Sequence, residues 1–496
     1  MKRLIFSLAI FGGVFGFTSC KKSLLDINQN PNSASYSTPQ LTMPVALENA
    51  ARRANTSYTN LGFWIGYYAT SSGFSKPVET YTYDITSTYL AGVWDNLYNN
   101  LEDFNYVEQQ AVLQKFPVYE AIAKVMKAYD FHQLVDLWGK VPYSDALRGD
   151  SGKFSPKFDE GQTIYEDLVK QIDAAVVIFN NPSTGNSISS ATDASRILLY
   201  GDLITTGGNP AFLRQWVKFS NTLKLKLLVQ QSAVAGRDAY IKQNLTGLTS
   251  DDFLGLGEDA LINPGYTTAT AQLNPWYGLF YKSYLSSGDN YNSTVASDYA
   301  ATSYNSNNDA RISYFYTKSG DTYQGSIFGD PAGNSKAAKI GAPSLDPTGP
   351  AWLMVAAESL FLQAEAVQRG YLAGDAQSLY ETAIKASFMY TGQTDSSYEA
   401  YMAQASPDIQ WNLATDKIKL IITQKWFAMN GIDILAAYND FRRTGFPDVP
   451  LSTDLNSKGK IPVRLFYPQR ETLLNTDNVL AAGTVDVFNT KVFWDK

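Results

Sequence analysis

Aromatic side chains that alternate with amides and carboxylates are the residues of this sequence best suited to chemistry. A first cluster lies between residues 274 and 292 and consists of Asn274, Trp276, Tyr277, Tyr281, Tyr284, Asp289, Asn290, Tyr291 and Asn292. Tyr and Trp offer flat apolar faces with a polar edge, and amide and carboxylate groups bond to hydroxyls. Sugars present flat C–H patches and a rim of hydroxyls, so this cluster predicts a carbohydrate-binding platform.

A second aromatic cluster lies nearer the start of the chain and consists of Trp64, Tyr67, Tyr68, Tyr81 and Tyr83. It offers another platform with the same chemistry. For any single ring, packing flat on a helical core with the hydroxyl in water is the simpler interpretation. Both interpretations stay open for each cluster as a whole. Trp94 and Tyr98 are one helical turn apart, and this spacing favours a place in the core.

Histidine and cysteine, which supply most catalytic triads and transition-metal sites, occur once each. A cysteine-rich zinc site and a disulfide within the chain are therefore excluded, and we expect no metal ion and no cofactor. His132 lies seven residues after Val125 on the same apolar stripe, which favours a packed, hydrogen-bonded histidine over a catalytic base. A surface glycosidase that uses two carboxylates stays an alternative, because the chain has 47 acidic residues.

The charge balance argues against nucleic-acid binding. Acidic residues outnumber the 40 basic ones, and the formal net charge is −7. Proteins that bind phosphate backbones gain affinity through clustered Lys and Arg. We find no basic cluster larger than pairs such as Lys21-Lys22 and Arg442-Arg443, so nucleic acid is not an expected partner.

The N-terminal residues are typical of an export signal. Met1-Lys2-Arg3 is a short basic head, and Leu4 to Phe17 is an apolar stretch too short and too rich in glycine to span a membrane. Residues 1–19 are therefore predicted to be a signal peptide. The lone Cys20 directly after it resembles the lipobox of bacterial lipoproteins, which implies cleavage before Cys20 and its acylation, for example with palmitate. The alternative is an ordinary leader with a chance cysteine near its end.

Residues 20–40 are predicted to be a lipidated tether. The stretch after Cys20 is rich in Asn, Ser and Pro and has almost no periodic apolar pattern, so it cannot bury enough surface to order itself. Acyl chains would hold the protein to a membrane, because each buried methylene group contributes about 0.8 kcal/mol. We therefore expect a protein that is anchored to the membrane rather than spanning it.

The remaining residues, 41–496, are predicted to form a single, mainly α-helical domain. Apolar periodicity predicts helices over residues 117–138, from the Asn209-Pro210 pair onward, and from Asp416 to a stop at Asn430-Gly431. Each of these segments carries a cap, a first-turn proline or a stop signal in addition to its apolar stripe. The pattern therefore predicts the ends of the helices as well as their existence.

Two further segments define the architecture within this domain. Residues 351–390 have the spacing of a tetratricopeptide-like helix pair, with Ala376, Tyr380 and Ala383 on the second helix. From about residue 255 to 341 helical periodicity fades, and Gly, Asn, Ser, Thr and Tyr dominate. We expect an irregular, loop-rich ligand-binding region there, packed against the helix pairs.

Four charged residues of the C-terminal half are predicted to be structural. Glu358 and Glu365 lie seven apart on one helix face, which would also suit a paired-acid site. The simpler interpretation is one buried hydrogen-bonding position and one solvated position. Arg442 and Arg443 are predicted to tie the C-terminal segment to carboxylates or carbonyls.

Several stretches along the chain together resemble one family. They are LLDINQNPN after Cys20, VWDNLYNNLEDFN at 93–105, DLWGKVPYSDAL at 136–147, WVKFSNTLKLKLL at 216–228, SLFLQAEAVQRG at 359–370, ITQKWFAMNGIDILAAYNDFRRTGFP at 422–447 and RLFYPQRETLLN at 464–475. In their order and number they resemble the SusD/RagB-type outer-membrane nutrient-binding lipoproteins of Bacteroidetes, most closely the SusD-like second branch. The resemblance spans nearly the whole chain.

This resemblance implies a fold and a function. The fold is mostly helical, with tetratricopeptide-like helix pairs against an irregular ligand-binding part. The function is non-catalytic capture of an oligosaccharide or other nutrient at the cell surface and delivery to a SusC-like TonB-dependent outer-membrane transporter. A peptide or another small nutrient is an alternative ligand, and the neutral, Asn/Tyr-rich loops favour neutral sugars. Lys21-Lys22 differ from the acidic residues that often follow the acylated cysteine in surface-exported lipoproteins of this phylum.

Overall fold

Long helices form most of the structure, a computed structural model that describes residues 37–188, 197–283, 286–341 and 346–496. Residues Pro39–Lys496 make up one compact unit, and the predicted mainly α-helical fold is confirmed. Residues 1–36, which contain the predicted signal peptide, Cys20 and most of the predicted tether, lie outside the described residues. Helix α1 begins at Pro39, so the last two residues assigned to the tether are helical.

The helices fall into a long and a short class. The long helices are α1 (Pro39–Thr56), α4 (Ala91–Gln114), α5 (Pro117–Trp138), α6 (Gly161–Phe179), α9 (Gly208–Gln230), α15 (Ala356–Gln368), α16 (Ala376–Tyr390), α18 (Lys417–Met429) and α19 (Ile434–Thr444). The short helices are α2 (Thr59–Trp64), α3 (Val78–Thr82), α8 (Gly201–Thr206), α10 (Asp238–Leu245), α11 (Pro275–Phe280), α12 (Asp289–Ser293), α13 (Asp298–Ser306), α14 (Ile312–Phe315), α17 (Asp395–Met402), α20 (Gln469–Leu474) and α21 (Thr476–Ala482).

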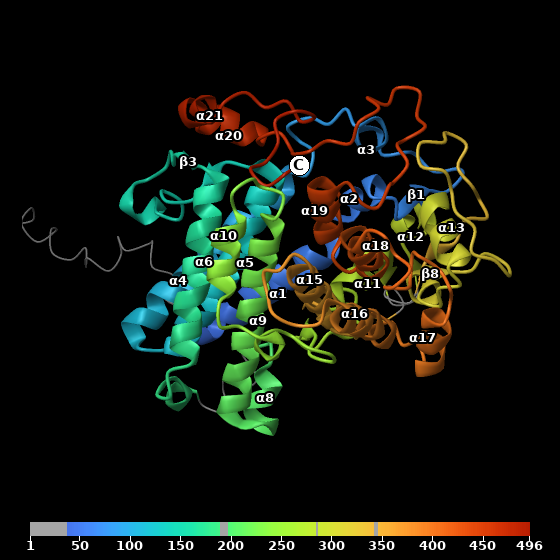
Figure 1. The fold of residues 1–496 in the computed structure, drawn as a ribbon. Helices are drawn as coiled ribbons and strands as arrows, with labels where there is room; N and C mark the ends of the chain where they lie inside the picture. The colour runs from blue at the N-terminus through green and yellow to red at the C-terminus, as the bar shows by residue number, and fades with distance from the viewer. Residues whose placement is uncertain (1–36, 189–196, 284–285, 342–345) are drawn as a thin grey trace, which may run out of the picture. The chain divides into compact units, whose positions relative to one another are not determined.

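The long helices pack in two groups. Helices α4, α5, α6 and α9 lie side by side in chain order, and α15 packs against α16, α18 and α9. In Figure 1 the first group occupies the left side, the second group the centre, and the short elements α12, α13 and β8 the right side. Helix α9 contacts members of both groups, so it joins them.

Helix α5 shows why the first group forms. It begins at Pro117 in its first turn, as predicted, and almost every later side chain is buried. His132 is 2% exposed, and its Nδ1 lies 3.1 Å from Asp136 Oδ2. The predicted packed, hydrogen-bonded histidine is therefore confirmed. Trp94 is buried as predicted and packs edge-on against Trp138 of α5.

Two predicted helix starts need correction. Helix α9 begins at Gly208 rather than after an Asn209 cap, because the Asn209 amide donates to the Gly185 carbonyl 2.8 Å away. Residues 351–354 are a strand rather than the start of a helix, because they pair with residues 260–262. The start at Asp416 is confirmed, since its carboxylate accepts a hydrogen bond from the Lys419 amide.

Short strands lie mainly in the loop-rich region. They are β1 (Tyr68–Thr70), β2 (Val141–Pro142), β3 (Phe158–Asp159), β4 (Ala260–Ile262), β5 (Tyr281–Ser283), β6 (Ser286–Ser287), β7 (Thr294–Ala296), β8 (Tyr316–Thr317), β9 (Lys339–Ile340) and β10 (Ala351–Met354). One sheet has four strands in the order β1-β7-β9-β8. Strands β1 and β7 are antiparallel, with Thr70 opposite Thr294. This pairing brings together chain segments that are more than two hundred residues apart.

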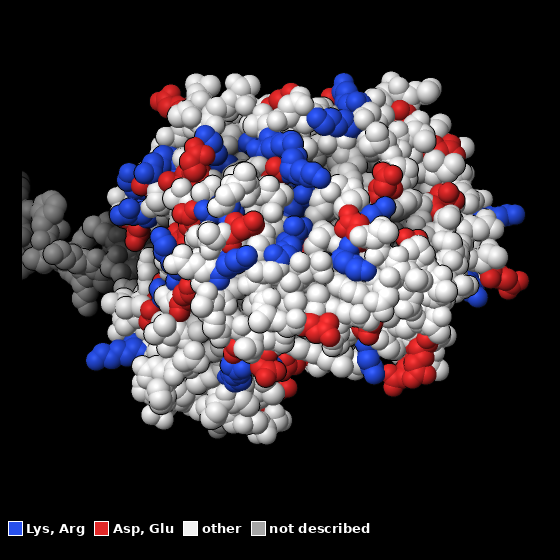
Figure 2. Space-filling view, viewed as in Figure 1, with Lys and Arg blue, Asp and Glu red and all other residues white. Residues whose placement is uncertain are grey.

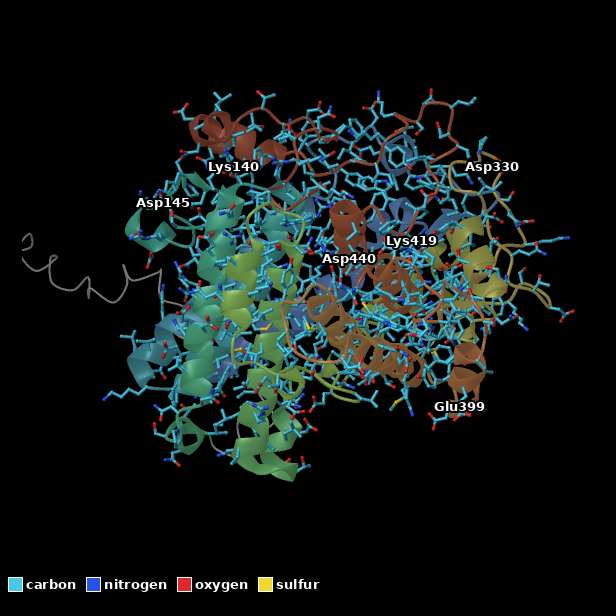
Figure 3. All side chains as sticks on the ribbon, in the orientation of Figure 1. Lys140, Asp145, Asp330, Glu399, Lys419 and Asp440 are labelled. Carbon is cyan, nitrogen blue, oxygen red and sulfur yellow. The ribbon has the colours of Figure 1, made fainter. Side chains whose placement is uncertain are left out.

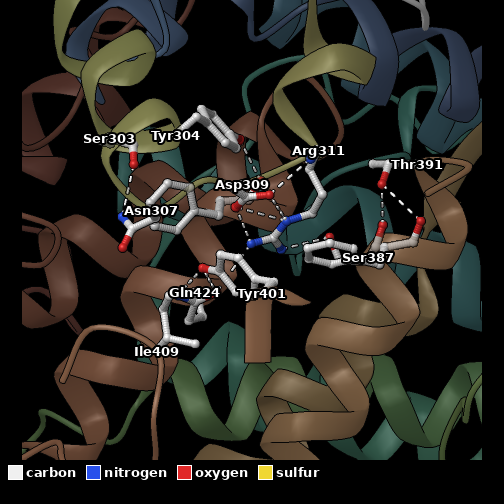
Figure 4. A network of polar contacts seen from close by, with 12 residues as sticks. Ser303, Tyr304, Asn307, Asp309, Arg311, Ser387, Thr391, Tyr401, Ile409 and Gln424 are labelled. Atoms are coloured by element: carbon white, nitrogen blue, oxygen red, sulfur yellow. Dashed lines mark hydrogen bonds and ion pairs between the residues drawn. The ribbon is translucent and has the colours of Figure 1, made fainter. Parts of the chain in front are cut away.

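A buried arginine fastens the loop-rich region to the helices. Arg311 precedes α14 and is fully buried, and its guanidinium binds the carboxylate of Asp309 at 2.7 Å. The same guanidinium donates to Ser387 of α16 at 3.1 Å and to Gln424 of α18 at 3.3 Å (Figure 4). Tyr401 of α17 also bonds to Gln424. These contacts hold the α13–α14 turn against three helices.

Buried ion pairs join the helices of the second group. Lys226 of α9 lies 2.8 Å from both Glu358 of α15 and Asp433 at the start of α19. Lys425 of α18 lies 3.0 Å from Asp440 of α19, which is labelled in Figure 3. Arg443 donates to both Asp440 and Glu365. Each charge is compensated inside the core, as burial requires.

Glu365 corrects one prediction from the sequence. Either Glu358 or Glu365 was expected to be solvated, yet they are 0% and 1% exposed. Burial opposes ionisation of Glu365, but Arg443 and Arg369 outweigh it and lower its pKa to about 2. Arg442 bonds to the Val463 carbonyl at 2.6 Å, so its predicted tie to the C-terminal segment is confirmed.

Charged side chains of both signs are interspersed on the surface. On the face shown in Figure 2, Lys and Arg lie close to Asp and Glu in several places, and large uncharged areas lie between these groups. Charges that remain in water are screened and contribute little to stability. We therefore expect the buried ion pairs to affect the free energy of unfolding more than the surface charges do.

We predict that Glu365→Gln lowers the free energy of unfolding by about 3 kcal/mol at pH 7. The folded pKa of about 2 lies below the ordinary value of 4.5. The stabilisation is therefore complete above pH 4.5 and is lost as the pH falls toward 2. Urea unfolding of both proteins at several pH values measures this difference, which should shrink in that window. Exposed Glu399→Gln, on α17, is the control, and an equal loss in the two variants would contradict the prediction.

Candidate functional site

The aromatic cluster near the start of the chain is part of the core. The rings of Trp64, Tyr67, Tyr68, Tyr81 and Tyr83 are all 0% or 1% exposed. Trp64 stacks on Tyr89 with ring centroids 5.4 Å apart, and its indole N–H donates to the Thr80 carbonyl. A ring without an exposed face cannot stack on a sugar, so these side chains pack the interior and are not part of the site described below.

The hydroxyls of this cluster bond inside the protein as well. Tyr67 stacks on Trp426 at 4.9 Å and donates to the Trp426 carbonyl. The Tyr81 hydroxyl accepts from the Thr70 amide at 2.8 Å. Burial raises the pKa of Tyr67 and Tyr81 above the usual tyrosine value. These groups therefore stay protonated and satisfied at neutral pH.

Two residues of the other predicted cluster are also structural. Asn274 is 3% exposed and caps α11, because its side-chain oxygen accepts from the Tyr277 amide at 3.1 Å. Its NH₂ group donates to the Gly349 carbonyl at 2.9 Å. Trp276 is 1% exposed and packs edge-on against Phe280. Asn274 and Trp276 therefore fix α11 in place instead of facing a ligand.

Three tyrosines of that cluster come together in a row, here called the tyrosine ladder. Tyr277 stacks on Tyr281 with centroids 4.4 Å apart, and Tyr281 lies 5.0 Å from Tyr291. Tyr281 and Tyr291 are half-buried. The Lys339 ammonium lies 4.9 Å from the centre of the Tyr291 ring and donates to Asn292 at 3.0 Å. Burial raises the pKa of Tyr281, and neighbouring Tyr291 adds to this effect.

The other predicted residues of the cluster are placed as follows. Tyr284 and the side chain of Asp289 lie outside the described residues. Asn290 is exposed, and its NH₂ group donates to the Leu279 carbonyl at 2.9 Å. This bond joins α12 to the end of α11. Of the predicted cluster, the structure therefore brings the tyrosine ladder and Asn290 together, whereas Asn274 and Trp276 are buried and hold α11 in position.

A pocket of about 490 Å³ lies beside these helices and is here called the α11–α12 pocket. Its volume is in the range of small-molecule sites. Three chain segments form it: the end of α1 with α2, the turn at residues 70–77, and the stretch from α11 to β7. The lining residues are Thr56, Ser57, Thr59, Asn60, Phe63, Thr70, Ser75, Lys76, Pro77, Leu279, Phe280, Asn290, Ser293 and Thr294.

The lining is mostly hydroxyl and amide groups over an aromatic base. Phe63 is 5% exposed, Phe280 is fully buried, and the remaining lining is dominated by Ser, Thr and Asn. Among the described lining residues none carries a carboxylate. The arrangement can bond to several hydroxyls of one ligand while an apolar surface lies beneath it. It has no acid pair for general acid–base chemistry.

Sequence reasoning missed most of this pocket. Of its lining residues only Asn290 was a predicted site residue. Thr56 to Asn60 lie at the boundary between two helices, and Ser75 and Lys76 lie in a turn, where no periodic pattern marks them. The positions of the two aromatic clusters in the sequence were the signal that could have found it. The pairing of β1 with β7 brings the segments beside these clusters together, and the pocket lies there.

Among the described residues, no group of three or more His, Cys, Asp or Glu side chains is placed to hold a metal ion. None of the helices in the described ranges is both long and apolar enough to cross a membrane.

Comparison with known structures shows the fold. A SusD homolog from Bacteroides uniformis is 24% identical, with a TM-score of 0.74 over 92% of this chain and 99% of that chain. A chitin-binding SusD homolog from Flavobacterium johnsoniae is 22% identical, with a TM-score of 0.72 over 92% and 98%. A SusD homolog from Bacteroides fragilis is 22% identical, with a TM-score of 0.74 over 93% and 100%.

Comparison with protein families extends this result to the sequence. No curated protein matches the chain. The second SusD-like family, described as starch-binding and associating with the outer membrane, matches residues 31–468. Since this match covers most of the chain and agrees with the fold, the protein belongs to the SusD-like family of the SusD/RagB group.

Proposed function

We propose that this protein binds an oligosaccharide at the cell surface without cleaving it, and that the α11–α12 pocket with the adjoining tyrosine ladder is the binding site. The observation that carries the proposal is the pocket's lining of hydroxyls and amides beside half-buried tyrosine rings. Membership of a family described as starch-binding supports it, as does the chitin-binding relative of the same fold.

The pocket and the ladder have complementary roles in this proposal. A sugar unit in the pocket exchanges hydrogen bonds with Asn60, Ser75 and Asn290, which replace bonds to water. The chain of sugars then continues along α12 to Tyr291, the last ring of the ladder. There a sugar face takes the place of the Lys339 ammonium over the ring.

The lining chemistry supports binding rather than hydrolysis. Glycosidases generally use two carboxyl groups about 5 to 10 Å apart on either side of the scissile bond. No carboxylate belongs to the described lining of the pocket. A surface glycosidase, which the count of acids left possible, therefore gains no support from this site.

We predict that Tyr291→Ala weakens oligosaccharide binding by about two- to tenfold, because a stacked aromatic face contributes about 0.5–1.5 kcal/mol. Isothermal titration calorimetry against a panel of starch, chitin and other oligosaccharides measures the affinity. Tyr291→Phe is the matched control, since it keeps the ring and should bind nearly as well as the wild type.

The same titrations test the whole proposal. The ligands recovered afterwards should carry no new reducing ends. A wild-type protein that binds no oligosaccharide of the panel, or that releases new reducing ends, would contradict non-catalytic glycan binding.

The second half of the proposal concerns location and delivery. Family membership supports association with the outer membrane. We infer that acylated Cys20 anchors the mature chain there and that a SusC-like TonB-dependent transporter receives the ligand. The predicted tether after Cys20 would then connect the acyl chains to the folded unit. Two or more acyl chains make such an anchor effectively stable.

We predict that native protein purified from outer membranes in mild detergent starts at an acylated Cys20 and copurifies with a large β-barrel transporter. Mass spectrometry of the N-terminal peptide and of the copurifying proteins measures both. Cys20→Ser should appear in the soluble fraction. An unmodified thiol in the native protein would refute the anchor, and a pure, unaccompanied protein would count against the transporter.

A further inference from the structure

One lysine distinguishes the α11–α12 pocket from a purely neutral sugar site. Lys76 is the single charged residue among the described residues that line the pocket. It follows the exposed residues 73–75 and is itself half-buried. The other polar lining groups are uncharged hydroxyls and amides. An unbound pocket with this lining therefore carries one positive charge.

The immediate surroundings of Lys76 leave its charge poorly compensated. Its ammonium donates one hydrogen bond, to the Ser71 carbonyl at 3.2 Å. The backbone at Gly333 lies against it so closely that a Cβ there would come within 2.9 Å of Nζ. No carboxylate of the described residues lies within ion-pair distance of Nζ. An ammonium has three donors, so donor capacity remains for a ligand.

Asp330 is the acidic residue whose charge acts on Lys76. It lies in the loop next to α13, where Figure 3 labels it, and its Oδ1 already accepts from the Ala332 amide at 2.9 Å. Burial lowers the pKa of Lys76, and the attraction of Asp330 does not restore it. The loss of solvation therefore outweighs the attraction of this neighbour, and a further negative charge in the pocket would be favourable.

We propose that the α11–α12 pocket selects a sugar unit that carries an anionic group, a carboxylate or a sulfate, and that Lys76 is the residue that recognises it. This inference rests on the proposed oligosaccharide binding and names the class of ligand. The anionic group meets the ammonium of Lys76, and the sugar hydroxyls meet the Ser, Thr and Asn side chains around it. Hydrogen bonds between charged groups are about twice as strong as those between neutral ones.

The proposal differs from the neutral ligand that the Asn/Tyr-rich loops favoured. A neutral sugar in this pocket would cover the ammonium without compensating it, and desolvating an unpaired charge is unfavourable. A uronate or sulfated sugar removes that cost. The pocket thus discriminates through the penalty for the wrong ligand as well as through the bond to the right one.

The test compares oligosaccharides of equal length in matched neutral, uronate and sulfated forms. Calorimetry on the wild-type protein should show at least one anionic form binding about tenfold tighter than its neutral match. The uronate and sulfate arms distinguish the two anionic groups. The preference should also shrink as the salt concentration rises from 50 to 500 mM, because screening weakens the ion pair.

Three variants assign the preference to Lys76. Lys76→Gln should remove most of the difference between anionic and neutral forms, whereas Lys76→Arg should keep it. Lys242→Gln, an exposed lysine on α10, is the control for a change in net charge and should behave as the wild type. The salt titration needs no variant, so it stands even where a substitution harms folding.

The outcomes separate the two proposals. Neutral forms that bind as tightly as every anionic match, or an anionic preference that persists in Lys76→Gln, would overturn the role of Lys76 and leave oligosaccharide binding in place. Binding of none of the forms by the wild type would overturn oligosaccharide binding, and the anionic preference with it.

Discussion

The structure depends on charges that are buried between helices and must be paired there. Lys226, Lys425 and Arg443 each meet at least one carboxylate from another helix of the core. An unpaired charge in such a place costs several kcal/mol. The pairs therefore tolerate little sliding of α9, α15, α18 and α19 past one another. Since Arg311 attaches the loop-rich region to α16 and α18, the position of the pocket follows from the same fixed helices.

Regular periodicity explains which parts of the fold the sequence could predict. The stripe of residues 117–138, the cap at Asp416 and the helix pair α15–α16 carry local signals, and the structure contains these helices. The burial of Glu365 is a feature that the local sequence pattern did not predict. Its helix is buried over most of its surface, so a charged residue on it does not mark the solvent side. The Glu365 carboxylate is paired both with Arg369, four residues away, and with Arg443 of α19, 78 residues away, and the second of these contacts leaves no local pattern.

The candidate site was predictable in part for a related reason. Tyrosines in a segment without helical periodicity indicated the ladder, which lies on α11, β5 and α12. Tyr67 and Tyr81 are aromatic residues of the same kind but lie in the core, because Trp426 of α18 covers Tyr67 and Phe328 covers Tyr81. Composition does not reveal such a cover. The pocket itself arises where β1 pairs with β7, and a contact between segments so far apart in the chain leaves no local pattern.

The construction of the pocket from three distant segments links ligand binding to folding. The unfolded chain cannot present Asn60, Lys76 and Asn290 together, so a ligand that needs all three binds only the native state. Such a ligand stabilises the protein by about 2.7 kcal/mol at a hundredfold excess over its dissociation constant. On the proposed function, a bound oligosaccharide would in this way protect the protein against heat and proteolysis for as long as it is present.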